Sequence, residues 1–257
     1  MAAFFELSEV TKFFGGVQAV SGMSFSLEKG ELAGLMGPNG AGKTTVFNLV
    51  TGVYSPDGGK IFFKGEDLAS LKTFEVTSRG IARTFQNLRL FQRSTVLENV
   101  MTAAQYHIPY SFAEGITHLG RWKAREKDIR EKSMALLDRV GLADRAGQEA
   151  GTLPYGHQRR LEIARALALD PELLLLDEPA AGMNAEEVGV LNMLIRTIHR
   201  DFGLTVLVIE HHMDLVMEIC PHIICMNFGA KIAEGTPDEI QNHPEVLKAY
   251  LGEEDEA

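Results

Sequence analysis

Several features that would place this sequence in other protein classes are scarce or absent. The 257 residues include two cysteines and one tryptophan, and no apolar stretch approaches the roughly 20 residues that a membrane-spanning helix needs. Cys220 and Cys225 match no metal-binding or disulfide pattern, so we expect both to be reduced core residues. Residues 1–14 lack a basic stretch followed by a hydrophobic one, so we expect no secretory signal.

The chain also has fewer basic than acidic residues. Lysine and arginine number 25 against 35 aspartates and glutamates, which gives a formal net charge of −10. Nucleic-acid-binding proteins usually carry a basic patch, so we predict no nucleic-acid partner. The same acidity disfavours direct attachment to anionic lipid. Because 45% of the residues are hydrophobic, the chain can fill a core, and we predict a soluble cytoplasmic protein that reaches a membrane only through a partner.

The order of apolar patterns predicts an α/β protein with a helical insertion. Residues 3–36 alternate between apolar and polar types, which is typical of β-strands. Residues 173–176 and 204–209 are almost wholly apolar, as buried parallel strands are. Between these regions, residues 87–170 are mainly helical in pattern, which predicts a separate helical subdomain.

Two shorter patterns add detail to this outline. Residues 66–80 are predicted to be mostly helical. Near the C-terminus, two short apolar runs flank Asn227-Phe228-Gly229, which predicts a β-hairpin with its turn at these residues.

The segment Gly37-Pro38-Asn39-Gly40-Ala41-Gly42-Lys43-Thr44 fits the phosphate-binding pattern G-x-x-x-x-G-K-[ST]. Successive N–H groups of such a loop can cradle phosphate oxygens. Lys43 adds a cation for the β- and γ-phosphates, and the Thr44 hydroxyl can ligate Mg²⁺. The loop follows a predicted strand at residues 31–36 and precedes a predicted helix at residues 44–51. A strand, a glycine loop and a helix start in that order predict an anion site.

Two adjacent carboxylates, Asp177 and Glu178, follow the apolar run of four leucines. In doubly wound sheets, ligands bind at the carboxyl ends of the strands. Asp177 can therefore hold Mg²⁺, directly or through water, while Glu178 can polarise an attacking water. An Asp-Glu pair is usually a helix cap or a surface acid pair, but the buried strand and the phosphate loop favour the site.

A third motif, Leu153-Pro154-Tyr155-Gly156-His157-Gln158-Arg159-Arg160-Leu161-Glu162-Ile163-Ala164-Arg165-Ala166-Leu167, strongly resembles the signature loop and following helix of ATP-binding cassette (ABC) ATPases. The phosphate loop, this signature, the Asp-Glu pair and a later histidine occur in the order and spacing of that family, over about residues 4–252. The four motifs together are far more specific than any one of them.

The resemblance implies a P-loop NTPase fold of the α/β class, with a mixed core sheet, an N-terminal antiparallel β-subdomain and an inserted helical subdomain. It implies one domain over residues 1–257. Residues 1–86 and 171–257 would form the RecA-like core with the β-subdomain, and residues 87–170 the helical subdomain that carries the signature.

Carried over residue by residue, the resemblance implies a role for each polar group. Glu178 matches the general base and Asp177 the Mg²⁺ residue. Gln86, which follows a predicted strand at the subdomain boundary, matches the glutamine that touches Mg²⁺ or the water. His211 matches the histidine that contacts the γ-phosphate. Its neighbour His212 then stands where many relatives have Asp.

The resemblance also implies the ligands ATP and Mg²⁺. Phe14 matches the aromatic residue that stacks on adenine, and Phe13 is an equal candidate. Tyr155 and Gly156 match the signature residues that bind the γ-phosphate of ATP held by a second subunit. The implied catalytic residues are Glu178, His211, Lys43 and Gln86, and the implied metal residues are Thr44, Gln86 and Asp177. The implied nucleotide-binding residues are Phe14, Gly37, Pro38, Asn39, Gly40, Ala41, Gly42, Lys43, Thr44, Thr45, Tyr155 and Gly156.

The sequence departs from the usual signature Leu-Ser-Gly-Gly-Gln. Pro154 replaces the serine, Tyr155 the first glycine and His157 the glutamine. Pro154 has neither a hydroxyl nor an N–H to offer a phosphate, so the contact must rest on the backbone of Tyr155 and Gly156 and on the helix dipole. Asn184 stands where many relatives have Asp. These changes affect the expected contacts across the dimer, not the overall reaction.

These departures from the usual signature also indicate which group of ABC ATPases the chain resembles. This signature is similar to that of branched-chain amino acid importers, and so are residues 85–91, 210–213 and 233–240. The loop of residues 105–125 resembles the longer insertion of the LivG-type subunit rather than that of its shorter companion.

The implied partners are membrane permease subunits, a second identical or paralogous cassette and, indirectly, a solute-binding protein. The chain would then lie at the cytoplasmic face of the inner membrane. Residues 87–110 are the expected docking surface for the permease, with Phe91, Val96 and Leu97 as candidates that could equally belong to the core.

Three other functions compete with this one. A non-transport ABC protein that acts on nucleic acid or ribosomes usually carries two cassettes, or long arms and basic surfaces. A small-molecule P-loop kinase would not need the signature helix, and an export cassette is commonly fused to membrane helices. A single acidic cassette without such helices favours an importer subunit.

Overall fold

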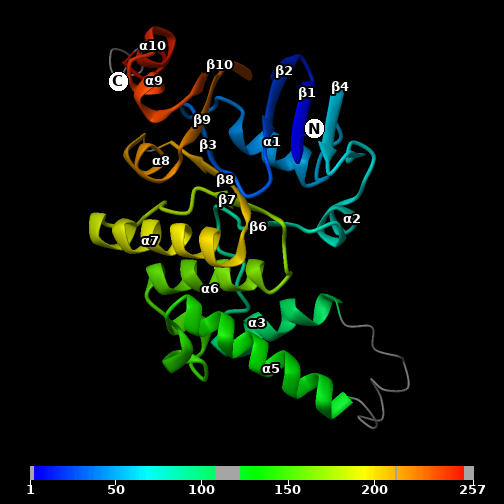
Figure 1. The fold of residues 1–257 in the computed structure, drawn as a ribbon, viewed down its shortest axis with the longest axis vertical. Coiled ribbons are helices and arrows are strands. Elements are labelled where there is room, and N and C mark those ends of the chain that lie inside the picture. The colour runs from blue at the N-terminus through cyan, green and yellow to red at the C-terminus, as the bar shows by residue number, and fades with distance from the viewer. Residues whose placement is uncertain (1–2, 108–121, 212, 252–257) are drawn as a thin grey trace.

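The structure, a computed structural model, describes residues 3–107, 122–211 and 213–251, and its core is a six-stranded mixed sheet (Figure 1). The strand order is β10-β9-β3-β8-β7-β6, and neighbours are parallel except for the antiparallel pair β9 and β10. The strands span Leu32–Met36 (β3), Ile81–Arg83 (β6), Leu173–Asp177 (β7), Thr205–Glu210 (β8), His222–Asn227 (β9) and Ala230–Gly235 (β10).

A second sheet is antiparallel, with four strands in the order β2-β1-β4-β5. The N–H of Ser21 donates to the Gly229 carbonyl at 2.8 Å and so joins this sheet to the turn between β9 and β10. Its strands span Phe5–Phe14 (β1), Val17–Leu27 (β2), Gly58–Phe63 (β4) and Glu66–Asp67 (β5).

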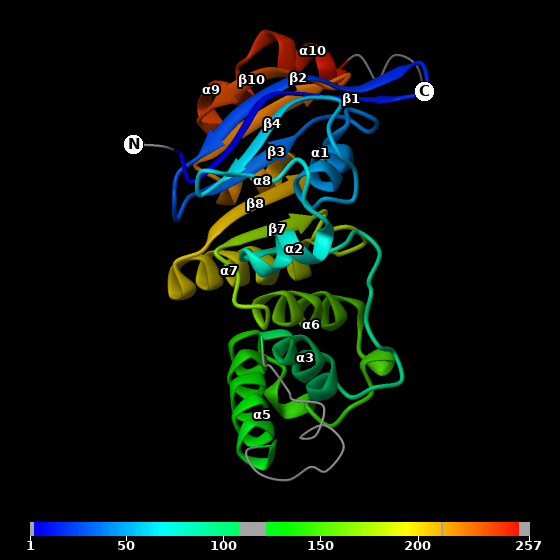
Figure 2. The same cartoon turned by 90° about the vertical axis from the view of Figure 1, so that its right-hand side faces the viewer.

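Helices cover both faces of the mixed sheet, with α1 on one face and α7 and α8 on the other (Figures 1 and 2). They span Lys43–Val50 (α1), Thr73–Ser78 (α2), Val96–Ala104 (α3), Trp122–Arg139 (α5), Tyr155–Leu167 (α6), Ala185–Phe202 (α7), Met213–Ile219 (α8), Pro237–Gln241 (α9) and Pro244–Leu251 (α10). Short 3₁₀ turns occupy Gln105–His107, Ala143–Arg145 and Ala150–Thr152.

Strand β7 shows why the central strands have such apolar sequences. Side chains alternate across a sheet, so successive residues face opposite sides. Leu173 and Leu175 pack with the antiparallel sheet and α1. Leu174 and Leu176 pack with the helices of the other face. Because both faces are covered, all four leucines are fully buried and the run is continuous rather than alternating.

Helices α3, α5 and α6 gather on the side of α7 that lies away from the sheet (Figures 1 and 2). One apolar cluster runs from Val100 of α3 through Leu161 of α6 and Leu191 of α7 to Leu176 of β7. The division into a core and a separate helical subdomain stays a prediction, and a continuous core crosses the proposed boundary.

The predicted fold class is confirmed, with its mixed sheet, N-terminal antiparallel sheet and helical insertion. The expectation for residues 66–80 is wrong in part, because they begin with β5 before α2. Lys64 and Gly65 have φ angles of 51° and 81°, which form the two-residue turn that folds β5 back onto β4. Lysine gives little turn signal at that position, so the sequence pattern missed the turn.

Both cysteines are buried and unpaired, which confirms the expectation for Cys220 and Cys225. Burial raises the pKa of both thiols to about 12, so they stay protonated and unreactive at neutral pH. In the described part of the chain, no helix has both the length and the apolar character that crossing a bilayer requires.

The two-sided core gives a direct prediction. Leu175→Ala removes a fully buried side chain, so we expect it to lower the free energy of unfolding by about 2–5 kcal/mol in urea denaturation. Leu247, whose side chain is 42% exposed, is the matched control, and Leu247→Ala should cost less than about 0.5 kcal/mol. Equal losses for both variants would contradict this account of the core.

Candidate functional site

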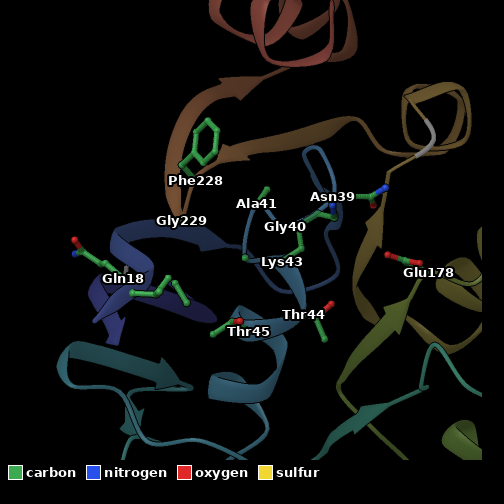
Figure 3. A pocket seen from close by; sticks show the side chains of 13 residues that line it. Gln18, Asn39, Gly40, Ala41, Lys43, Thr44, Thr45, Glu178, Phe228 and Gly229 are labelled. Atoms are coloured by element: carbon green, nitrogen blue, oxygen red, sulfur yellow. The ribbon is translucent and has the colours of Figure 1, made fainter. Parts of the chain in front are cut away.

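A pocket of about 350 Å³ opens beside the phosphate loop (Figure 3). Its walls come from the loop itself, from the residue after β7, from strand β2 and from the turn between β9 and β10. It therefore brings together segments from the start, middle and end of the chain. The lining residues are Val17, Gln18, Ala19, Asn39, Gly40, Ala41, Gly42, Lys43, Thr44, Thr45, Glu178, Phe228 and Gly229.

The phosphate loop is shaped by close backbone contacts. Gly42 has a φ of 103°, and a Cβ there would lie 2.5 Å from the Ala19 carbonyl oxygen, so only glycine fits. Helix α1 begins at the next residue without a side-chain cap, which leaves its start open to an anion. The buried Lys43 Nζ donates to the carbonyls of Gly37 (2.5 Å) and Pro38 (2.9 Å). Its ammonium group is thus held inside the loop.

Asp177 ends β7 and is 1% exposed. Its Oδ2 accepts a hydrogen bond from Arg83 Nη2 at 2.6 Å, and its N–H donates to Thr84 Oγ1 at 3.2 Å. Burial raises the pKa of the Asp177 carboxyl, and Arg83 opposes that rise. The buried Oδ1 has no hydrogen-bond partner among the described residues. A buried oxygen without a partner is suited to a metal ion or a metal-bound water.

The chemistry of this donor set fits Mg²⁺ held together with a triphosphate. Within the described ranges, no cluster of three or more His, Cys, Asp or Glu side chains could hold a metal. Mg²⁺ usually takes one or two protein ligands and completes its shell with phosphate oxygens and water. Asp177 and the Thr44 hydroxyl, which lines the pocket, would supply such ligands.

Glu178 adopts a backbone conformation that is uncommon for any residue except glycine, with φ of 44°. Its N–H donates to the Ile209 carbonyl at 2.9 Å, which fixes it between β7 and β8. Its carboxylate Oε2 accepts a hydrogen bond from Gln86 Nε2 at 2.7 Å. His211 Nδ1 lies 3.7 Å from Oε1 of the same carboxylate. The structure thus brings Gln86, Glu178 and His211 together.

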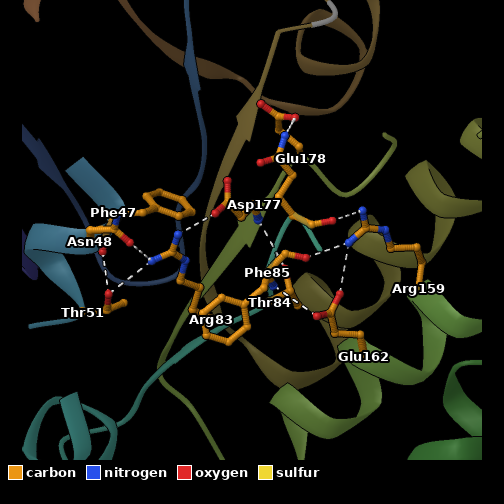
Figure 4. A network of polar contacts seen from close by, with 11 residues as sticks. Phe47, Asn48, Thr51, Arg83, Thr84, Phe85, Arg159, Glu162, Asp177 and Glu178 are labelled. Carbon is orange, nitrogen blue, oxygen red and sulfur yellow. Dashed lines mark hydrogen bonds and ion pairs between the residues drawn. The ribbon is translucent and has the colours of Figure 1, made fainter. Parts of the chain in front are cut away.

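Two side chains of helix α6 form hydrogen bonds with the backbone of the segment that carries Gln86 (Figure 4). The Arg159 guanidinium donates to the carbonyls of Phe85 (2.7 Å) and Gln86 (2.5 Å). Glu162 accepts from the Phe85 N–H at 3.2 Å and from Arg159 at 3.2 Å. Burial raises the pKa of the Glu162 carboxyl, while the Phe85 N–H and Arg159 act against that rise. We call these four residues the α6 clamp.

Another buried carboxylate, that of Glu210, links the two loops that follow β7 and β8. Glu210 has no exposed surface. Its Oε1 accepts from the Ala180 N–H at 3.0 Å, and its Oε2 accepts from the His211 N–H at 3.3 Å. Glu210 therefore ties the segment after Glu178 to His211.

The predicted signature residues lie outside the pocket of their own chain. Tyr155 begins α6 and accepts a hydrogen bond from Arg159 at 2.8 Å, and Gly156 is buried beside it. Pro154 gives α6 no side-chain cap. The roles expected for Tyr155 and Gly156 stay predictions.

The residues expected to stack on adenine are also absent from the pocket lining. Phe14 is 41% exposed and meets Tyr54 edge-on, with ring centroids 5.0 Å apart. Phe13 is 46% exposed. The roles of Phe14 and Phe13 stay predictions. The choice of His211 over His212 also stays a prediction, because His212 lies outside the described residues.

Asn184 stands where many relatives have Asp, and its side-chain oxygen still caps a helix. Its side chain accepts from the Glu187 N–H at 3.0 Å, and the Glu187 carboxylate accepts from the Asn184 N–H at 3.1 Å. This reciprocal pair caps the start of α7.

Four charged residues of the site were not singled out by the sequence. Arg83 and Glu210 could have been noticed as charges inside or at the end of otherwise apolar strands. Arg159 and Glu162 are opposite charges three residues apart on a helix, a spacing that brings side chains together. Such pairs are common on solvent-facing helices, so nothing in the sequence distinguishes this buried one.

A protein family described as "ABC transporter" matches residues 20–181. A second family, described as "Branched-chain amino acid ATP-binding cassette transporter", matches residues 230–256. The first match covers the phosphate loop, the signature and the Asp-Glu pair.

The full chain is similar to curated transport proteins. It is 45% identical over 248 residues to the high-affinity branched-chain amino acid transport ATP-binding protein BraF of Pseudomonas aeruginosa, covering 96% of this chain and 97% of that protein. It is 42% identical over 240 residues to LivG of Escherichia coli, covering 93% and 94% of the two chains.

The fold matches solved cassettes as well. The structure resembles the crystal structure of the ADP conformation of MJ1267, an ATP-binding cassette of an ABC transporter, with a TM-score of 0.85 and 30% identity. The match covers 98% of this chain and 100% of that one. Both the sequence and the fold therefore place this chain in the ABC transporter family, among its ATP-binding cassettes.

Proposed function

We propose that this chain hydrolyses ATP to energise an importer of branched-chain or other hydrophobic amino acids. The observation that carries the proposal is a pocket lined both by Lys43 and Thr44 of the phosphate loop and by Glu178, the residue after β7 (Figure 3). The solute class is supported by BraF and LivG, whose names describe branched-chain amino acid transport.

In the proposed reaction, Lys43 and the start of α1 neutralise the β- and γ-phosphates. Glu178 takes a proton from a water whose oxygen bonds to the γ-phosphorus. The bond from that phosphorus to the β–γ bridging oxygen breaks, which releases ADP and phosphate. Gln86 orients the Glu178 carboxylate through the 2.7 Å hydrogen bond. His211, beside the other carboxylate oxygen, contacts the γ-phosphate.

The proposed metal site uses the Thr44 hydroxyl, the free oxygen of Asp177 and Gln86. These residues would hold Mg²⁺, which would supply positive charge to offset the charge that develops on the phosphates. Arg83 occupies the other oxygen of Asp177, which keeps the carboxylate fixed in one orientation.

We propose that two cassettes, identical or paralogous, form the working unit. The signature residues Tyr155 and Gly156 lie outside their own pocket, and the uncapped start of α6 is suited to a phosphate held by the other subunit. Closure of the two cassettes would complete both sites and exclude water.

The proposed docking surface for a membrane permease lies at α3 and the segment before it. Phe91 is 50% exposed, whereas Val96 and Leu97 are buried at 0% and 5%. Of the three candidates, only Phe91 can meet a partner. Phe74, which is 62% exposed, lies near the end of α3, because its carbonyl accepts a hydrogen bond from the Tyr106 hydroxyl at 2.8 Å. The permease would hold the chain at the cytoplasmic face of the membrane, and a solute-binding protein would act on it only through the permease.

The general base gives the first test of this mechanism. We expect Glu178→Gln to lower kcat for phosphate release by about 10²–10⁴-fold, because the amide cannot accept the proton. ATP binding, measured by calorimetry, should persist. The control is Glu245→Gln, which makes the same charge change at an exposed site on α10. Normal hydrolysis by the Glu178 variant would remove this residue from the base role.

The α6 clamp gives a second test. Arg159→Lys keeps the charge but loses the fork that reaches two carbonyls, so Gln86 should be misplaced and kcat should fall about tenfold or more. KM for ATP should change little, since Arg159 does not line the pocket. Arg165→Lys is the matched control on the same helix, because Arg165 donates to the Arg89 carbonyl instead. A rise in KM without a fall in kcat would contradict the positioning role.

A further inference from the structure

The turn between β9 and β10 places a bulky residue where the backbone disfavours it. Asn227 pairs with Ala230 across the hairpin, so Phe228 and Gly229 are the two turn residues. Their φ angles are 45° and 81°, the pattern of a type I′ turn, which favours Asn or Gly at the first position. A phenylalanine with positive φ is an outlier. Such strained residues cluster at functional sites.

The same turn is fastened to the phosphate loop. The Gly229 N–H donates to the Ala41 carbonyl at 2.9 Å, and the Gly229 carbonyl accepts from the Ser21 N–H at 2.8 Å. A Cβ on Gly229 would lie 2.8 Å from the Ala19 oxygen. The position of Phe228 relative to the phosphate loop is therefore fixed by backbone contacts on both sides.

The ring of Phe228 points into solvent at the pocket. Its side chain is 87% exposed, yet it lines the pocket together with Val17, which is 67% exposed. Within residues 3–107, 122–211 and 213–251, no aromatic ring or cation pairs with Phe228. Phe14, by contrast, already packs against Tyr54 and lies 5.6 Å from Lys12 Nζ.

The pocket has two chemically different ends (Figure 3). Glu178 lies at one end, and Phe228 and Gln18 lie on the other side of the phosphate loop. A nucleoside triphosphate has the same polarity, with a charged phosphate end and an apolar, aromatic base. The exposed ring therefore stands at the end of the pocket that the base would reach.

We propose that Phe228 and Val17 form an apolar subsite for the base of the nucleotide, with the ring of Phe228 stacking on it. The subsite deepens the proposed function and rests on it, because it takes ATP as the bound nucleotide. The strained turn is retained because the ring contributes binding energy that Asn at this position would not.

Phe228→Asn removes the aromatic ring but keeps the turn conformation, because Asn-Gly is the preferred sequence of a type I′ turn. With magnesium present, we expect the Asn variant to bind ATP about tenfold more weakly in calorimetry. Its affinity for inorganic tripolyphosphate, which has no base, should not change. Its urea midpoint should equal or exceed that of the unaltered chain. Phe228→Tyr should restore ATP affinity.

Phe202→Ala, which removes another half-exposed ring at the end of α7, is the control and should leave both affinities unchanged. Unaltered ATP affinity in the Asn variant, or equal loss for both ligands, would overturn the base subsite alone. If the unaltered chain binds neither ATP nor tripolyphosphate, the proposed function fails and the subsite fails with it.

Discussion

The site depends on one guanidinium group. Arg159 holds two consecutive backbone carbonyls of the segment that carries Gln86, and Gln86 in turn holds one oxygen of Glu178. Arg159 and Glu162 are 2% and 5% exposed. Burying such an ion pair is costly unless its hydrogen bonds are satisfied. The buried Arg159 Nε has no hydrogen-bond partner among the described residues, while the Phe85 and Gln86 carbonyls accept from both terminal nitrogens of Arg159. The Phe85 N–H also donates to one oxygen of Glu162. Helix α6 is thereby linked by hydrogen bonds, through Gln86, to the carboxylate of Glu178, which is the proposed general base.

The other polar groups of the site lie at one edge of the mixed sheet, where its parallel strands have their carboxyl ends. The phosphate loop follows β3, Asp177 ends β7, and Glu210 ends β8, which are adjacent parallel strands. Parallel strands end at one edge, so their loops meet there. The antiparallel sheet and the β9–β10 turn add the far wall of the pocket. Helix α6 begins at Tyr155 without a side-chain cap, which is the feature behind the proposal that its start binds a phosphate held by a second subunit.

Much of this arrangement could be predicted from the sequence, because the motifs have local causes. A glycine loop after an apolar strand, and two carboxylates after four leucines, specify the phosphate loop and the end of β7 without tertiary information. The hydrogen bond from Arg159 to Phe85 could not be predicted, since it joins a residue type that is common on helix surfaces to a backbone carbonyl 74 residues away. The hairpin turn that carries Phe228 was predicted from the sequence. The hydrogen bond that fastens this turn to the phosphate loop, from the Gly229 N–H to the Ala41 carbonyl, leaves no sequence signal.

The most direct test of the account is a crystal structure of the chain with a non-hydrolysable ATP analogue and magnesium. The account predicts the Glu178 carboxylate within hydrogen-bond reach of a water beside the terminal phosphate, with Arg159 still bonded to the carbonyls of Phe85 and Gln86. A structure in which Glu178 turns away from that phosphate, or in which the Gln86 segment has left Arg159, would contradict it.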